Sequence, residues 1–252
     1  MNTESICSDY TMLNFKRCVS ARQFTKITTS AQLFIYWDTC ALLDILRIPL
    51  PEHKYTVENL LEYEKIYEYI KSNEAVSIAS FVTKCELADN TLKAYSRLLK
   101  GESDLKKKII NFVRFSRNAD SSDLIIDSVN ELNISNRCYS LFCNICKNTH
   151  ILNDSAKIRR IAHDRVVNHI APAHQKTEYK DCYIWATYVD IMKRNSHNPI
   201  GIFFTTNTSD FKEKEQKEAC IQLKKDISFS QNLHITFSIG EMIGKVEAYR
   251  HR

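Results

Sequence analysis

The stretch LFIYWD, Leu33 to Asp38, is a short apolar run that ends in a carboxylate. A strand that is apolar on both faces is typical of the buried middle of a parallel sheet. In such sheets, ligands and catalytic groups collect beyond the carboxyl ends of the strands. Because an uncompensated buried charge costs several kcal/mol, we expect Asp38 to meet a partner at that edge.

The composition predicts a helix-rich globular protein. The chain has 252 residues, of which 44% are hydrophobic and 26% charged, and it contains only four glycines and four prolines. These proportions suit a protein with a sizeable core and exclude a low-complexity or all-β chain. The sequence shows no internal repeat and no Gly/Ser linker, so residues 1–252 are predicted to form a single domain.

The same sequence argues against a membrane or secreted protein. No apolar stretch reaches the roughly 20 residues of a membrane-spanning helix, and the polar segment Met1–Tyr10 is unlike a secretory signal. The nine cysteines are odd in number and scattered, unlike a disulfide framework. We therefore expect a cytoplasmic protein. The net charge of +5 permits a nucleic-acid partner without requiring one.

Further apolar runs predict strands at residues 75–79, 199–206 and 233–237. Apolar residues at helical spacing separate them, which indicates an α/β fold with a parallel sheet of four or more strands flanked by helices. Residues 90–176 show no strand pattern, and we expect a helical insertion at residues 91–175. Ser80 is expected to cap the helix that carries Glu86; other helices are predicted at 41–46, 56–71, 92–99, 105–113, 122–132, 137–146, 155–170 and 181–192.

Three carboxylates are predicted near the carboxyl ends of these strands. Asp38 directly follows its strand, with the N-cap of the next helix as an alternative role. Glu86 lies near a helix face that should pack on the sheet, with a solvated glutamate as the alternative. Asp181 stands at the N-terminal end of an apolar helical stripe, where the helix dipole alone also favours an acid.

The segment TTNTSDF, residues 205–211, adds short oxygen-bearing side chains directly after a buried strand. Together with Asp38 and Asp181 it predicts a site of oxygen ligands, which hard cations such as Mg²⁺ and Mn²⁺ select. Converging carboxylates repel one another, and a bound metal is the usual compensation. The chemistry that fits is hydrolysis of a phosphodiester by a metal-activated water.

The form and order of these motifs resemble the PIN-domain nucleases. The motifs are FIYWDTCALLD with Asp38, SFVTKCEL with Glu86, KDCYIWATYVD with Asp181 and FFTTNTSDF with Asp210. They lie in the sheet-forming parts of the chain, roughly residues 31–90 and 176–245. The resemblance implies a metal-dependent ribonuclease in which these four acids hold Mg²⁺ or Mn²⁺.

Further residues are assigned to the surroundings of this predicted metal site. Asn207 stands where many members of the resembling family carry another acid, which implies a weaker second metal site. Thr39 and Thr206 are expected to orient groups through their hydroxyls. Basic residues that precede Asp181 in the sequence would bind the phosphates beside the scissile bond. The alternative is that these residues form a solvated helix face. The expected RNA contacts are Arg165, Lys176 and Lys180.

The predicted function is a metal-dependent endoribonuclease. Members of the resembling family commonly act as toxins or defence effectors restrained by an inhibitory protein partner, or as RNA-processing enzymes, and homo-oligomers are common. The alternative is a catalytically weak nucleic-acid-binding or protein-interaction module on the same fold. A receiver-like domain would carry paired acids before the strand, where Thr29 and Ser30 stand. Zinc is not predicted, because no turn-bearing knuckle is evident around Cys143, Cys146 and His150.

Overall fold

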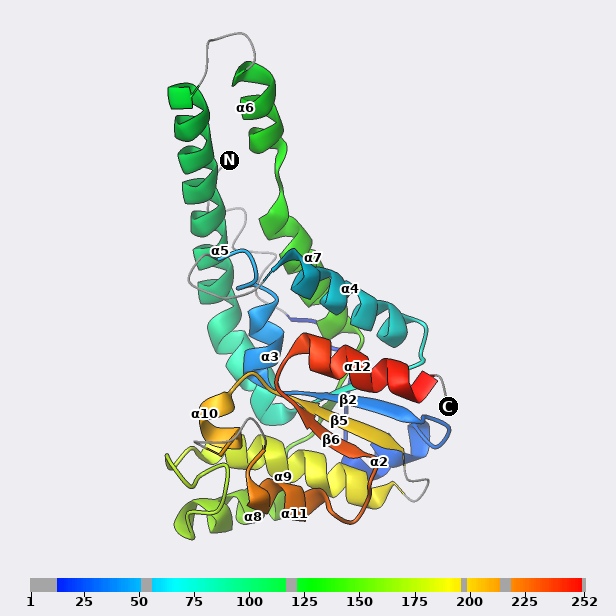
Figure 1. The fold of residues 1–252 in the computed structure, drawn as a ribbon. Coiled ribbons are helices and arrows are strands. Elements are labelled where there is room, and N and C mark those ends of the chain that lie inside the picture. Colours follow the sequence, from blue (N-terminus) through cyan, green and yellow to red (C-terminus); the bar gives the residue numbers. More distant parts are fainter. Residues whose placement is uncertain (1–12, 51–55, 117–121, 196–198, 214–218, 251–252) are drawn as a thin grey trace.

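Six parallel strands form one sheet, in the order β1-β4-β3-β2-β5-β6. The computed structural model describes residues 13–50, 56–116, 122–195, 199–213 and 219–250. The sheet confirms the prediction of a parallel α/β fold with four or more strands flanked by helices (Figure 1). The strands are β1 (Arg17–Val19), β2 (Leu33–Trp37), β3 (Val76–Ser80), β4 (Thr149–Leu152), β5 (Ile200–Phe204) and β6 (Leu233–Thr236).

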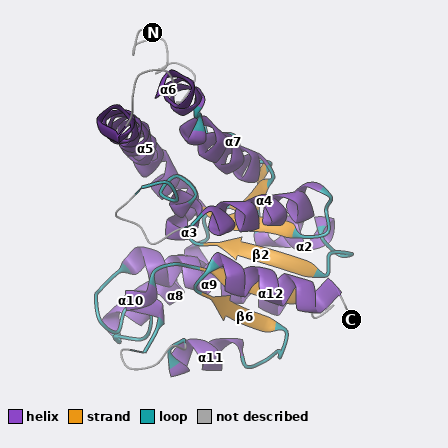
Figure 2. Ribbon diagram, turned by 45° about the horizontal axis from the view of Figure 1, so that its top comes forward, coloured by secondary structure: helices purple, strands orange, loops and turns teal. Residues whose placement is uncertain are grey.

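Helices cover both faces of the sheet (Figure 2). They are α2 (Ala21–Ile27), α3 (Thr39–Asp44), α4 (Val57–Lys71), α5 (Phe81–Ser116), α6 (Ser122–Glu131), α7 (Ile134–Lys147), α8 (Ala156–Val167), α9 (Tyr179–Arg194), α10 (Thr208–Phe211), α11 (Ile221–Ile227) and α12 (Ile239–Arg250). Helices α3, α4, α7 and α12 pack on one face, whereas α2, α9 and α11 pack on the other. Among the described residues, no helix is long and apolar enough to cross a membrane.

Strand β2 lies in the middle of the sheet, as its apolar sequence predicts. All five of its residues are buried. Leu33, Ile35 and Trp37 pack into the core of one face, and Phe34 and Tyr36 into that of the other, because side chains alternate along a strand. Each large apolar side chain that is fully buried contributes about 1.5–3 kcal/mol. This burial fixes where β2 ends and therefore where the next residue emerges.

Strand β4 differs from the expectation of helices alone at residues 91–175. It pairs in parallel with β3 and β1 and so extends the sheet on that side. Buried polar groups explain why its sequence lacks an apolar strand pattern. The Thr149 hydroxyl lies 2.6 Å from the Ser77 hydroxyl, which accepts the Trp37 indole N–H at 2.8 Å. Strand β1 lies before the first strand that the sequence predicted.

Helix α5 is a single helix of 36 residues that joins three of the predicted ones. The Ser80 hydroxyl accepts the Thr83 N–H at 2.9 Å, which confirms its capping role. Beyond the sheet, α5 continues as a rod that packs beside α6 (Figure 1). Because Glu86 lies in the second turn of α5, the rod starts at the carboxyl edge of the sheet.

Candidate active site

The carboxyl ends of β2 and β5 bring Asp38 and Thr205 together. The two strands pair with Trp37 opposite Phe204, and the Asp38 N–H donates to the Phe204 carbonyl at 3.0 Å. Thr205 directly follows β5, and its hydroxyl donates to Asp38 Oδ2 at 2.6 Å. The parallel register of β2 and β5 therefore positions Asp38 and Thr205 next to each other.

Asp38 is buried and accepts hydrogen bonds on both carboxylate oxygens. Oδ1 accepts the Thr39 N–H at 2.6 Å, so Asp38 does cap helix α3. Oδ2 accepts the hydroxyl of Thr205 and the thiol of Cys40, the latter at 2.9 Å. The capping role therefore uses one oxygen and leaves the other for the site. Burial raises the pKa of Asp38, and the charge of Glu86 raises it further.

Cys40 is a site residue that sequence reasoning missed. Its Sγ lies 2.9 Å from Asp38 Oδ2 and 3.4 Å from the Thr205 hydroxyl, and it accepts the Thr206 N–H at 3.3 Å. Burial and the charge of Asp38 raise the pKa of this thiol well above its usual value, so it stays protonated and donates. The available signal was its place two residues after Asp38, in the first turn of the helix.

Glu86 joins the site through Thr39. The Thr39 hydroxyl donates to Glu86 Oε2 at 2.6 Å, which ties the start of α3 to α5. Lys180 Nζ lies 3.1 Å from Glu86 Oε1, and this partner raises the pKa of the lysine. The structure thus places Thr39 and Lys180 beside the acids, where the sequence led us to expect them.

Asn207 bridges the two remaining carboxylates. Its amide nitrogen donates to Asp181 Oδ2 at 3.1 Å and to Asp210 Oδ2 at 2.8 Å. Asp181 lies in the first turn of α9, and Asp210 is buried in the short helix α10. Asp210 Oδ1 is buried and has no hydrogen-bond partner among the described residues. A buried carboxylate oxygen left in this way is unfavourable unless a donor or a cation reaches it.

The acids give the site an excess of negative charge. Burial raises the pKa of Asp181 to about 8, and the charges of Asp38, Asp210 and Glu86 add to the shift. Such a shift means that ionising Asp181, buried and beside other acids, costs free energy. A cation bound among their oxygens would remove much of this cost.

The donor set fits a hard divalent cation. Carboxylate and amide oxygens are the ligands that Mg²⁺ and Mn²⁺ prefer. Within the described ranges, however, no three His, Cys, Asp or Glu side chains are grouped closely enough to hold a metal ion. Hydrogen-bond donors separate the acids: the Asn207 NH₂ group lies between two of them, and Thr39 and Lys180 hold Glu86. To ligate a cation, Asn207 would have to present its carbonyl oxygen instead.

The other predicted contacts, Thr206, Lys176 and Arg165, differ in how far they are buried. Thr206 is partly buried and follows Thr205 at the end of β5, whereas Lys176 is exposed in the segment before α9. Arg165 is buried: its guanidinium donates to the Ala171 carbonyl and pairs with Asp226. Because Arg165 joins α8 to α11 in this way, it could bind a phosphate only by giving up its ion pair.

Comparison with known proteins assigns a family to this arrangement. A family model described as a PIN domain matches residues 35–211, which is more than half of the chain and includes all four acids. No match was found among curated proteins, and none among solved structures.

Proposed function

Because the chain belongs to the PIN-domain family, we propose that it is an endoribonuclease that hydrolyses RNA with Mg²⁺ or Mn²⁺. PIN domains are generally nucleases, and metal-dependent ribonucleases are their general class. One observation carries the proposal. Among the described residues Asp210 Oδ1 is buried without a partner, one amide away from Asp181, whose pKa burial and neighbouring charges raise to about 8. This is a site that favours a bound cation.

The four acids, Asp38, Glu86, Asp181 and Asp210, would hold the cation. When bound, such a cation lowers the pKa of a coordinated water and stabilises negative charge on the phosphate. Asn207 could offer only a neutral oxygen, and only after its amide turned, where a further acid would favour a second cation, so we propose one tightly held metal ion rather than two.

The surrounding residues hold these acids in place. The Thr205 hydroxyl and the Thr39 N–H fix the two oxygens of Asp38, and the Thr39 hydroxyl fixes Glu86. Fixed ligands of this kind are what a metal-dependent hydrolase requires of its protein. Lys180 lies at the rim beside Glu86, where its ammonium can pair with a substrate phosphate.

RNA is the substrate class that the family supports. A toxin or defence role, an inhibitory protein partner, a homo-oligomer and a cytoplasmic location stay predictions. The alternative of a catalytically weak binding module on the same fold is separated from the nuclease by measuring cleavage and binding side by side.

The test uses purified protein and a circular single-stranded RNA, which has no ends, so that any cleavage is endonucleolytic. We expect Mn²⁺-dependent cleavage that excess chelator abolishes, and its loss in Asp38→Asn and Asp181→Asn. The matched control is Glu68→Gln, which neutralises an exposed acid on α4 and should cleave like the wild type. If the wild type and both site variants leave the RNA equally intact while binding it, the binding module is correct.

A further inference from the structure

Helix α5 carries a line of basic side chains beyond the site. Lys93, Arg97, Lys100 and Lys108 recur at helical spacing and therefore share one face. All four are exposed, and within the described residues none of them forms an ion pair. Two acids share this face: Asp89 lies one turn before Lys93, and Asp104 lies between Lys100 and Lys108. Cations placed in a row repel one another, so the row is suited to an anionic partner.

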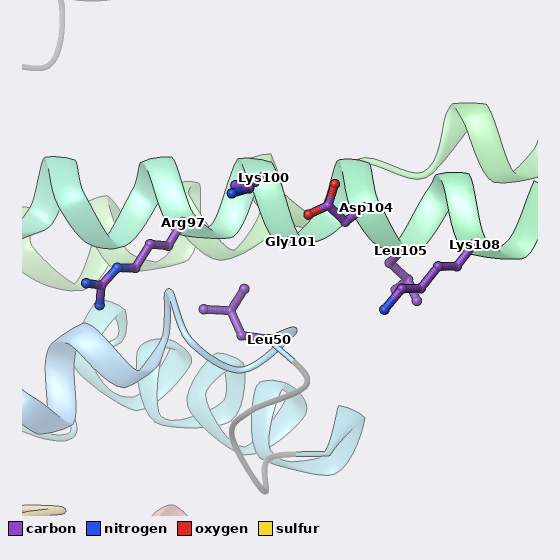
Figure 3. A pocket seen from close by; sticks show the side chains of 7 residues that line it. All are labelled: Leu50, Arg97, Lys100, Gly101, Asp104, Leu105 and Lys108. Carbon is purple, nitrogen blue, oxygen red and sulfur yellow. The ribbon is translucent and has the colours of Figure 1, made fainter.

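This face of α5 lines two adjoining hollows, opposite the segment that follows α3. Figure 3 shows Leu50 facing the helix, with the Arg97 and Lys108 side chains extending toward the same side. Leu50 lies so close to the helix that a Cβ on Gly101 would come within 2.5 Å of its Cδ2. We call this surface the α3–α5 groove; it is defined by Arg47, Leu50, Lys93, Arg97, Lys100 and Lys108.

The α3–α5 groove lies one helical turn of α5 from the candidate active site. Its two walls are tied together there, because the Thr39 hydroxyl at the start of α3 donates to Glu86 on α5 at 2.6 Å. Asn90, one turn beyond Glu86, lines the nearer hollow together with Lys93. From Glu86 to Lys108 the helix rises about 33 Å, at about 1.5 Å per residue.

We propose that the α3–α5 groove binds the sugar–phosphate backbone of an RNA strand that extends from the active site. The proposal rests on the proposed function, since it names the same substrate. Lysine and arginine side chains bind phosphates regardless of sequence. A rise of about 33 Å matches about ten nucleotides of a stacked strand at about 3.4 Å each. A single row of cations that starts at Lys93, two turns beyond Glu86, fits a regular row of phosphates better than the irregular acids of a folded protein.

The test compares three variants of the full chain by fluorescence anisotropy, with the metal chelated so that no cleavage occurs. The groove variant is Lys93→Gln/Arg97→Gln/Lys100→Gln. The matched control, Lys26→Gln/Lys147→Gln/Lys245→Gln, removes the same charge from exposed positions on α2, α7 and α12. Arg97→Lys keeps the charge of the groove. Thermal unfolding of each variant establishes that it is folded.

For a single-stranded RNA of about 15 nucleotides, we expect the groove variant to bind about tenfold more weakly or worse. The slope of log K against log salt should fall by about 2, at about 0.7 for each phosphate that the protein no longer neutralises. The control variant and Arg97→Lys should bind like the wild type. An RNA of about five nucleotides, which is too short to follow the row, should lose less affinity in the groove variant.

Two outcomes separate this proposal from the proposed function. If the groove and control variants bind RNA with the same Kd and the same salt slope, the groove proposal is overturned, even where the wild type cleaves RNA. In that case the groove variant can be screened for loss of an acidic protein partner. If the chelated protein binds through the groove but never cleaves RNA with Mn²⁺, the groove proposal stands and the nuclease is overturned.

Discussion

Asn207 donates a 2.8 Å hydrogen bond to Asp210 with the same amide nitrogen that reaches Asp181 at 3.1 Å. A neutral side chain thus bridges these two carboxylates with hydrogen-bond donors. The amide reduces their repulsion, but it also points its donor toward the place where a cation would bind. The identity of residue 207 therefore affects both stability and metal affinity.

The first prediction concerns Asn207→Asp. We expect the metal-free variant to be less stable than the wild type by about 1–3 kcal/mol, because two hydrogen bonds are lost and a further negative charge is added. Mn²⁺ should raise the melting temperature of the variant by more than that of the wild type. Asn207→Ala is the control, since it removes the donor without adding charge and should gain nothing from Mn²⁺ beyond the wild type. Equal metal-free stability of Asn207→Asp and the wild type would contradict the bridging role.

The second prediction concerns pH. The folded-state pKa of Asp181 is raised from 3.8 to about 8, so the folded protein binds this proton more tightly than the unfolded chain does. The free energy of unfolding of the metal-free protein should therefore fall as the pH rises from about 4 to about 8, by at most about 1.4 kcal/mol per pH unit for this group. Above about pH 8 the loss is complete.

Urea unfolding in the presence of chelator measures this effect as the difference between the wild type and Asp181→Asn. The variant cannot ionise at this position, so its advantage over the wild type should grow between about pH 5 and about pH 8. A difference that stays constant over this interval would show that Asp181 does not titrate in the way its surroundings imply.

The third prediction uses metal binding without any cleavage. A ligand that binds only the folded state stabilises it by about 2.7 kcal/mol at 100 times its Kd. We expect Mg²⁺ or Mn²⁺ to raise the melting temperature of the wild type, and excess chelator to reverse the rise. The shift should vanish in Asp38→Asn/Asp181→Asn and persist in Glu68→Gln. An equal shift in all three proteins would place the metal elsewhere.

The fourth prediction concerns Arg165, which sequence reasoning assigned to RNA. Trp185 also donates to Asp226, at 2.8 Å, so Arg165→Met would leave this acid with an indole partner but without its cation. We expect a loss of about 3 kcal/mol in the free energy of unfolding and unchanged RNA affinity of the folded variant. Arg159→Met breaks an exposed ion pair of 3.4 Å with Asp154 and should cost less than about 1 kcal/mol. Weakened RNA binding by folded Arg165→Met would restore the original assignment.

The contrast between β2 and β4 shows what the sequence could and could not predict. The all-apolar run of β2 leaves no role other than a buried central strand, and the side-chain alternation of the structure follows from it. Strand β4 is only four residues long and includes Thr149 and His150. Its threonine donates to the nearby Ile145 carbonyl and lies against the buried Ser77 hydroxyl of β3, and the second of these partners cannot be recognised from the local pattern.

The same limit applies to the candidate site. Asp181 could be placed from helical spacing, because the apolar stripe that follows it settles which way its side chain points. The hydrogen bonds of Cys40 and Thr205 to Asp38 could not be predicted, since the Thr205 contact depends on β2 and β5 ending in register at Asp38. Arg165 was assigned from local charge alone, and its buried partner Asp226 lies far along the chain.

The unbroken course of α5 fixes the distance between the residues at its two ends. Glu86 and Lys108, the last cation of the α3–α5 groove, belong to one continuous helix, so the distance between the proposed cleavage site and the far end of the proposed RNA contact is fixed by a number of helical turns. An RNA strand bound at both places would be cleaved at a set distance from the phosphate that Lys108 binds. Deleting one turn between Lys93 and Lys108 would shorten that distance by about 5.4 Å, and the lengths of the cleavage products would show it.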